Sequence, residues 1–98
     1  MDFQWDEDKR RYNLEKHGVD FWDVTRIFEN PLVLNYSPRG DEIRFVAIGR
    51  LIPPESVPNQ WSGPLVAVVY TIRDGEIRII SARRASTNER KQYRSRIS

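Results

Sequence analysis

The C-terminal quarter of the chain concentrates guanidinium groups, which are well suited to binding phosphate. Residues 77–98 hold one acidic side chain, Glu89, and these basic ones: Arg78, Arg83, Arg84, Arg90, Lys91, Arg94 and Arg96. Arginine stays charged and makes paired hydrogen bonds to phosphate oxygens. Residues 1–42 are instead richer in acids than in bases. This segregation of charge indicates a polyanionic partner for the basic half, although a basic surface that is merely solvated remains the alternative.

Three further side chains could transfer protons. His17 is the single histidine of the chain and follows Lys16 near the end of an expected helix, and Tyr93 lies in the last expected helix. Histidine, lysine and tyrosine can all act as general acids or bases. A histidine in the last turn of a helix also interacts favourably with the helix dipole, and Tyr93 could simply pack. Structural roles for both residues therefore stay open.

The composition excludes several kinds of site. The chain has 98 residues, enough for one small domain over residues 1–98. The absence of cysteine excludes a disulfide framework and a thiolate metal site, and a single histidine excludes a multi-histidine centre. No spacing supports a carboxylate metal site, so we expect neither metal nor cofactor. No stretch is apolar enough to span a membrane and no signal peptide is apparent, so we expect a cytoplasmic protein without a membrane partner.

Local sequence patterns predict the elements that must position these residues. A short strand at 3–5 precedes a helix that Asp6 caps and Gly18 ends after His17. Asp20 begins a second helix, whose apolar stripe should face the core. That stripe comprises Phe21, Val24, Ile27 and Phe28. The Asn30-Pro31 pair ends this helix.

The second half of the chain reads as strands followed by a helix. Strands are expected at 32–36, 43–51, 65–73 and 77–84, and a short final helix from Ser86 or Thr87. The segment 52–64 holds four prolines and a glycine, which predicts a long irregular connection. The fold class is therefore α+β, with an antiparallel sheet.

The Asp74-Gly75 pair predicts a two-residue hairpin turn, which determines the register of the last two strands. In that register Arg78 opposes Thr71, Ile80 opposes Val69 and Arg84 opposes Leu65, and opposed residues share a face. This face should be free of helices and should gather four arginines: Arg44, Arg50, Arg78 and Arg84. Such a cluster is typical of a surface that binds a polyanion, although Glu42, Glu76 and Glu89 could pair with these arginines. Arg83 is expected on the core side, in an ion pair with an N-terminal acid.

Two blocks, WDEDKRRYNLEKHGV at the N-terminus and IRIISARRASTNER near the C-terminus, resemble the BrnT family of bacterial toxins. Arg44-Phe45, Ile48-Gly49 and Val69-Tyr70-Thr71 add to the resemblance, which covers nearly the whole chain. It implies a RelE-like fold with two N-terminal helices packed on one face of the sheet. It also implies an RNA-cleaving toxin of a type II toxin–antitoxin pair that inhibits translation and growth. The implied partner is a BrnA-type antitoxin with a ribbon-helix-helix part, through which operator DNA would be contacted only indirectly.

The chemistry that this resemblance implies is metal-independent cleavage of RNA, in which the ribose 2′-hydroxyl attacks the neighbouring phosphorus. Arginines would stabilise the extra negative charge, and the candidates are Arg44, Arg78 and Arg84. His17, Lys16 and Tyr93 are the candidates for proton transfer. The residues expected to bind RNA are Arg50, Thr71 and Arg90.

Two alternatives use the same arginines without catalysis. The chain could be a nucleic-acid-binding module, or a protein-interaction domain whose basic face binds only an acidic antitoxin segment. One departure from the family concerns segment 52–64, which is longer than the usual hairpin loop at this place.

Overall fold

The computed structural model describes residues 2–51 and 63–97. The predicted irregular connection at 52–64 falls mostly outside this range. Four helical segments are described: α1 (Glu7–His17), α2 (Phe21–Val24), the 3-10 helix η1 (Thr25–Glu29) and α3 (Thr87–Ile97). The described strands are β1 (Phe3–Gln4), β2 (Val33–Arg39), β3 (Glu42–Arg50), β4 (Leu65–Arg73) and β5 (Glu76–Arg84). The predicted order of helices and strands is confirmed.

The ends of α1 have the local chemistry that the sequence predicted. The side chain of Asp6 accepts hydrogen bonds from the backbone N–H groups of Asp8 and Lys9, so it caps the first turn. Gly18 adopts a left-handed conformation with φ of 70° and donates its N–H to the carbonyl of Leu14. A glycine suits this conformation because it has no Cβ to clash.

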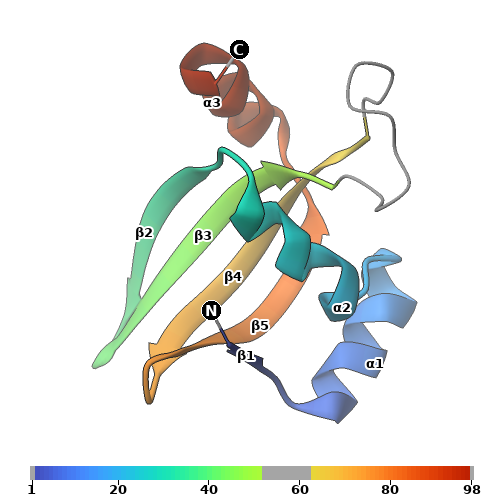
Figure 1. Cartoon of the computed structure of the whole chain (residues 1–98), viewed down its shortest axis with the longest axis vertical. Coiled ribbons are helices and arrows are strands. Elements are labelled where there is room, and N and C mark those ends of the chain that lie inside the picture. The colour runs from blue at the N-terminus through green and yellow to red at the C-terminus, as the bar shows by residue number, and fades with distance from the viewer. Residues whose placement is uncertain (1, 52–62, 98) are drawn as a thin grey trace.

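The sheet is mixed, with the strand order β1-β5-β4-β3-β2 (Figure 1). Strands β2 to β5 pair antiparallel, but β1 pairs with β5 in parallel, through Phe3 with Ile77 and Gln4 with Arg78. The expectation of a purely antiparallel sheet is therefore wrong. Strand β2 also continues through Pro38, beyond the predicted 32–36, which an edge strand allows because one side of it has no neighbour.

A β-bulge in β5 changes the predicted register of the last hairpin. Arg78 pairs with Thr71 as predicted, but Ser81 pairs with Val69 and Arg84 with Val66, so Ile80 is an extra residue. A shift of one residue exchanges the two faces of a strand. The predicted pairs of Ile80 with Val69 and Arg84 with Leu65 are therefore wrong. Arg83 now shares a face with Ala67, which is the face that we predicted for Arg84.

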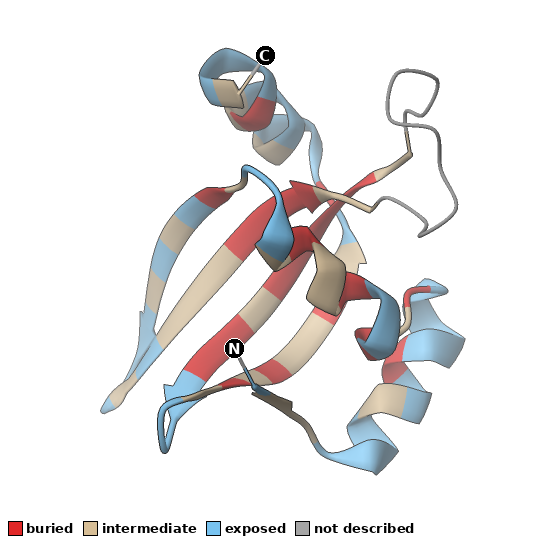
Figure 2. Ribbon diagram, in the orientation of Figure 1, coloured by how far each residue is buried: buried red, intermediate tan, exposed pale blue. Residues whose placement is uncertain are grey.

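Two apolar clusters lie on opposite faces of the sheet. The larger one joins α2 and η1 to the sheet through Phe21, Val24 and Ile27, each fully buried, against Val66 and Val68. The predicted apolar stripe is thus confirmed as core, with Phe28 only partly buried. The smaller cluster joins Tyr93 and Ile97 of α3 to the other face (Figure 2 shows where buried residues lie). In the described part of the chain, α2 and η1 cover the centre of the first face, whereas α1 lies beside β5 (Figure 1).

The close approach of η1 to the sheet depends on a glycine. A Cβ at Gly49 in β3 would lie 3.0 Å from the Cβ of Ile27 in η1. Real Cβ atoms rarely come so close, so any larger residue here would push η1 away from the sheet.

Candidate functional site

Helix α1 is attached to the edge of β5 by the side chain of one buried residue, Asn13. Its Nδ2 donates to the carbonyl of Ala82 (2.7 Å) and to that of Val19 (3.0 Å), and its Oδ1 accepts from the N–H of Ala82 (3.1 Å). Strand β1 pairs with β5 only at Ile77 and Arg78. The amide of Asn13 therefore hydrogen-bonds the N–H and C=O of Ala82 at the edge of β5, beyond the residues that pair with β1.

Attachment of α1 at this edge forms a pocket with a high density of positive charge. The pocket has a volume of about 470 Å³, within the usual range for ligand sites. Its lining comprises Lys9, Tyr12, Asn13, Lys16, His17, Ile80, Ser81 and Arg83, and we call it the basic pocket. The residues from α1 follow a spacing of three or four, so they share one face of that helix. The β5 residues lie at and just after the bulge.

The guanidinium of Arg83 is held in place by α3. Its Nη1 donates to Oε1 of Glu89 (2.7 Å) and its Nη2 to Oε2 (3.0 Å). Glu89 also accepts from the N–H of Ser86 (2.8 Å), whose Oγ accepts from the N–H of Glu89 in return. The hydrogen bonds from Arg83 lower the pKa of Glu89, and the carboxylate raises the pKa of Arg83 in turn. The prediction that Arg83 pairs with an N-terminal acid on the core side is thus wrong.

A second basic feature crosses the open part of the sheet, away from α2. Ser37 pairs with Arg44, Thr71 pairs with Arg78, and Arg78 pairs with Gln4. The hydroxyl of Thr71 donates to the carbonyl of Ile43 (2.7 Å), which keeps β3 beside β4 at this level. We call Arg44, Thr71, Arg78 and Gln4 the arginine row. The expectation that Arg44 and Arg78 share one face is confirmed.

The two arginines of this row have different partners. Arg44 lies 3.1 Å from the carboxylate of Glu42, whereas Arg78 donates to the neutral amide oxygen of Gln4 (2.8 Å). Gln4 therefore compensates the charge of Arg78 less than Glu42 compensates the charge of Arg44. Thr71 is buried, and its hydroxyl hydrogen is donated to the carbonyl of Ile43. It therefore holds β3 and β4 together beneath the row.

The other predicted site residues lie outside the basic pocket. Arg50 shares the face of Arg44, as predicted, but α3 packs on that face, so the expectation that it is free of helices is wrong. Arg84 is exposed and shares its face with Val66, so its predicted place beside Arg44 and Arg78 is wrong. Tyr93 is buried in the smaller apolar cluster, with the guanidinium of Arg50 5.7 Å from its ring centroid. Arg90 donates to the carbonyl of Ala85 (2.9 Å) at the start of α3. None of these four residues lines the basic pocket.

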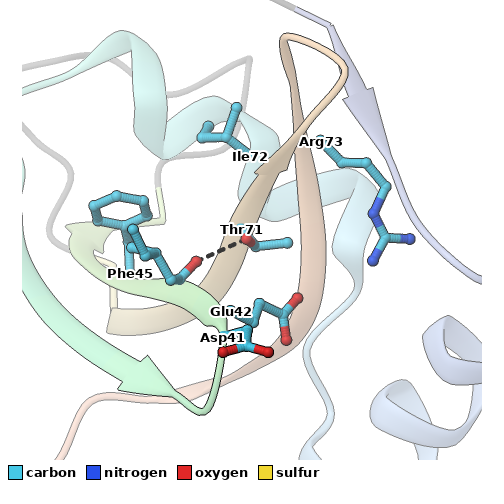
Figure 3. Close-up of a pocket in the computed structure, with 7 residues that line it drawn as sticks. Asp41, Glu42, Phe45, Thr71, Ile72 and Arg73 are labelled. Atoms are coloured by element: carbon cyan, nitrogen blue, oxygen red, sulfur yellow. Dashed lines mark hydrogen bonds between the residues drawn. The ribbon is translucent and has the colours of Figure 1, made fainter.

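A larger groove, of about 590 Å³, lies between the tips of the two hairpins but does not have the charge of a phosphate site. Its described lining includes Asp41, Glu42 and a single cation, Arg73. Figure 3 shows both carboxylates there, and its dashed line marks the hydrogen bond that Thr71 donates. Because Glu42 is already paired with Arg44, Asp41 and Arg73 remain, and they give the groove no net positive charge to attract a polyanion. Size alone therefore does not identify the site.

The sequence carries a signal for the part of the basic pocket that α1 contributes. Lys9, Asn13, Lys16 and His17 fall at positions i, i+4, i+7 and i+8, the spacing of one helix face. Arg83 could not be found in this way, because its place depends on the bulge at Ile80. Within residues 2–51 and 63–97, no group of three or more His, Cys, Asp or Glu side chains is arranged to hold a metal ion.

Comparison with known protein families identifies the class of protein to which this site belongs. Residues 5–89 match the family of the ribonuclease toxin, BrnT, of type II toxin–antitoxin systems. The chain therefore belongs to the BrnT toxin family, whose substrate is RNA and whose partner is an antitoxin. The resemblance in the two sequence blocks is thus confirmed. The comparison with curated proteins returned no match.

None of the helices in the described part of the chain is both long and apolar enough to cross a membrane.

Proposed function

We propose that this toxin cleaves RNA without a metal ion, and that the basic pocket is where the reaction takes place. The observation that carries the proposal is the convergence of Lys9, Lys16, His17 and Arg83 in one concave site. A phosphate group in this pocket would meet the ammonium groups of Lys9 and Lys16, an imidazole, and the guanidinium of Arg83, whose charge Glu89 partly compensates. The family description, a ribonuclease toxin, supports RNA as the source of that phosphate.

The proposed reaction begins when the 2′-oxygen of a ribose bonds to the adjacent phosphorus and gives up its proton. The bond from phosphorus to the 5′-oxygen then breaks, which leaves a 2′,3′-cyclic phosphate and a 5′-hydroxyl. In this scheme one of His17 and Lys16 accepts the proton of the 2′-hydroxyl and the other donates a proton to the leaving 5′-oxygen, while Arg83 and Lys9 stabilise the additional negative charge. Tyr93 is buried in the smaller cluster, so we no longer assign it a proton-transfer role.

The arginine row would bind the RNA backbone next to the pocket, since β5 contributes to both. Arg78 lies in the row, and Ser81 and Arg83 line the pocket a few residues further along the same strand. At about 3.3 Å per residue, this places the two features roughly 10–17 Å apart along the strand. Arg44 and Arg78 thus become binding residues in the proposal rather than catalytic ones.

The remaining parts of the proposal concern the cell. We place the toxin in the cytoplasm, as a single domain with a RelE-like fold, where RNA cleavage would inhibit translation and growth. Its partner would be a BrnA-like antitoxin with a ribbon-helix-helix part, and operator DNA would be reached only through that antitoxin. The type II family supports a protein antitoxin as partner.

The test is cleavage of a defined RNA by the purified toxin in EDTA, with analysis of the product ends. We expect cyclic or 3′-phosphate ends, and a loss of about 10²–10⁴-fold in rate for His17→Ala or Lys16→Ala if either transfers a proton. Arg11→Ala is the matched control, because Arg11 is exposed on the same helix and does not line the basic pocket. Activity that EDTA abolishes and magnesium restores would contradict the metal-independent mechanism. Full activity of both pocket variants would contradict the site.

A further inference from the structure

A groove with the opposite character to the basic pocket lies between β1 and the α2–η1 segment. One hollow of about 440 Å³ is lined by Asp2, Phe3, Gln4, Trp5, Trp22 and Thr25. An adjoining hollow of about 220 Å³ shares Phe3 and Thr25 and continues to Phe28 and Glu29. We call the two hollows the acid-rimmed groove. None of the described residues that line it is basic, and none of them lines the basic pocket.

Aromatic rings form the walls of the acid-rimmed groove. The rings of Trp5 and Trp22 meet edge to face with centroids 4.8 Å apart, and those of Phe3 and Phe28 are 5.5 Å apart. Trp22 is 60% exposed although tryptophan has the largest side chain. Tryptophan is enriched among the residues that dominate protein–protein binding energy, so an exposed tryptophan beside a groove indicates a binding surface.

The charges around the groove determine which partner fits it. Asp2 and Glu29 line it and are exposed. Asp23, next to Trp22 in the chain, is half exposed, and Arg26 lies 3.9 Å from it. Arg26 offsets the charge of Asp23, so the two lining carboxylates, Asp2 and Glu29, determine the charge of the groove, and they repel the phosphates of RNA. They attract a cationic segment, and a cation above the face of an indole ring gains a further cation–π attraction.

We propose that the acid-rimmed groove binds a cationic segment of the antitoxin, with an arginine or lysine over Trp22 and an apolar side chain against Phe3 and Phe28. The antitoxin itself follows from the type II family; the groove and the chemistry of the segment follow from complementary charge. The antitoxin then holds the toxin at a surface separate from the basic pocket. Its affinity therefore does not depend on the residues of the basic pocket, although the groove shares Gln4 with the arginine row.

The experiment measures the affinity of the purified full-length cognate antitoxin for the toxin by calorimetry. We expect Trp22→Ala to raise Kd by roughly 30-fold, the effect of removing a dominant interface residue. Glu29→Lys should also raise Kd, because it reverses a charge at the rim. The increase relative to the wild-type toxin should be larger at lower ionic strength. Both residues are surface-exposed, and circular dichroism and RNA cleavage by the same variants, which we expect to match the wild-type toxin, report whether the fold is kept.

Two matched controls locate the surface. Tyr36 is 63% exposed on β2, far along the sheet from β1, and Glu15 is exposed on α1. Tyr36→Ala and Glu15→Lys should leave the Kd of the antitoxin unchanged. If Tyr36→Ala weakens binding and Trp22→Ala does not, the docking surface is at β2 and the proposal is overturned.

Two other occupants of the groove have distinct signatures, and either would overturn the proposal. A second copy of the toxin would appear as a dimer in sedimentation that Trp22→Ala converts to monomer. RNA would appear as weaker RNA binding by Trp22→Ala with an unchanged Kd for the antitoxin. Failure of the cleavage test above would leave these affinity results interpretable, because they do not require activity.

Discussion

Glu89 connects β5 to the start of α3 through one carboxylate. It holds the guanidinium of Arg83 at the basic pocket, and it forms a reciprocal pair of hydrogen bonds with Ser86 at the start of α3. Its side chain is 14% exposed, whereas that of Arg83 is 37% exposed. Solvent therefore screens the pair partly, and its contribution to stability lies well below that of a fully buried pair.

Replacement of Glu89 by Gln should lower the free energy of unfolding in a pH-dependent way. At neutral pH we expect a loss of about 1–2 kcal/mol, since hydrogen bonds to a charged group are lost at a partly exposed site. The pKa of Glu89 lies below its ordinary 4.5 in the folded state. The carboxylate therefore stabilises the fold fully above that value and loses this contribution as pH falls toward the folded-state pKa. Urea unfolding of wild type and variant at several pH values measures the difference.

The control for this prediction is Glu15→Gln, at an exposed position on α1. It should change stability little at any of these pH values. A difference between wild type and Glu89→Gln that stays constant from neutral pH to about pH 3 would show that the charge of Glu89 does not contribute.

Among the secondary-structure elements, α1 has the least apolar attachment. Its described residues include one that is buried, and that residue is the polar Asn13. The helix is therefore held by polar contacts: the hydrogen bonds of Asn13 to Ala82 and Val19, and the ion pair of Arg10 with Asp20. The pocket side chains that α1 contributes depend on the same contacts.

Asn13→Ala should consequently destabilise the protein by about 2–4 kcal/mol, because the N–H and C=O of Ala82 lose their partners in a buried place. Thermal and urea unfolding measure this loss. Asn35→Ala is the matched control: the side chain of Asn35 donates to Oε1 of Gln92 at a partly buried site, and its removal should cost about 1 kcal/mol. Equal losses for the two variants would contradict the special role of Asn13.

At the scale of the whole molecule, basic and acidic surfaces are kept apart although the net charge is only +2. The basic pocket and the arginine row share β5, while the acid-rimmed groove lies between β1 and α2–η1. Such separation directs a polyanion to one surface and a cationic partner to another.

This separation predicts the salt dependence of RNA binding. A single-stranded 2′-O-methyl RNA cannot be cleaved through its 2′-oxygen and can therefore be used to measure binding. The logarithm of its association constant should fall linearly with the logarithm of salt concentration. Replacement of both Arg44 and Arg78 by Ala should reduce that slope by roughly 1.4, at about 0.7 per phosphate contact. Fluorescence anisotropy over a salt series gives both slopes. The double variant Arg11→Ala, Lys91→Ala removes the same charge elsewhere. An equal change of slope in that variant would contradict specific binding of RNA by the arginine row.

The order of elements, the caps of α1, the apolar stripe of the second helix and membership of the toxin family could all be predicted from the sequence. Each depends on residues that are close together in the chain: Asp6 and Gly18 at the ends of one helix, or Phe21, Val24 and Ile27 at helical spacing. The Asp74-Gly75 turn likewise determined the register near itself, where Arg78 pairs with Thr71. Local chemistry is sufficient for such features, because neighbouring residues interact whatever the rest of the fold does.

Only the tertiary structure decided which arginines meet which partners. A single extra residue at Ile80 exchanges the faces of Arg83 and Arg84, and nothing in the alternation of side chains marks that residue as a bulge. The parallel pairing of β1 and the attachment of α1 through Asn13 join residues 69 or more positions apart. The basic pocket forms from those long-range contacts, so its existence followed from how α1 meets the edge of β5 rather than from either segment alone.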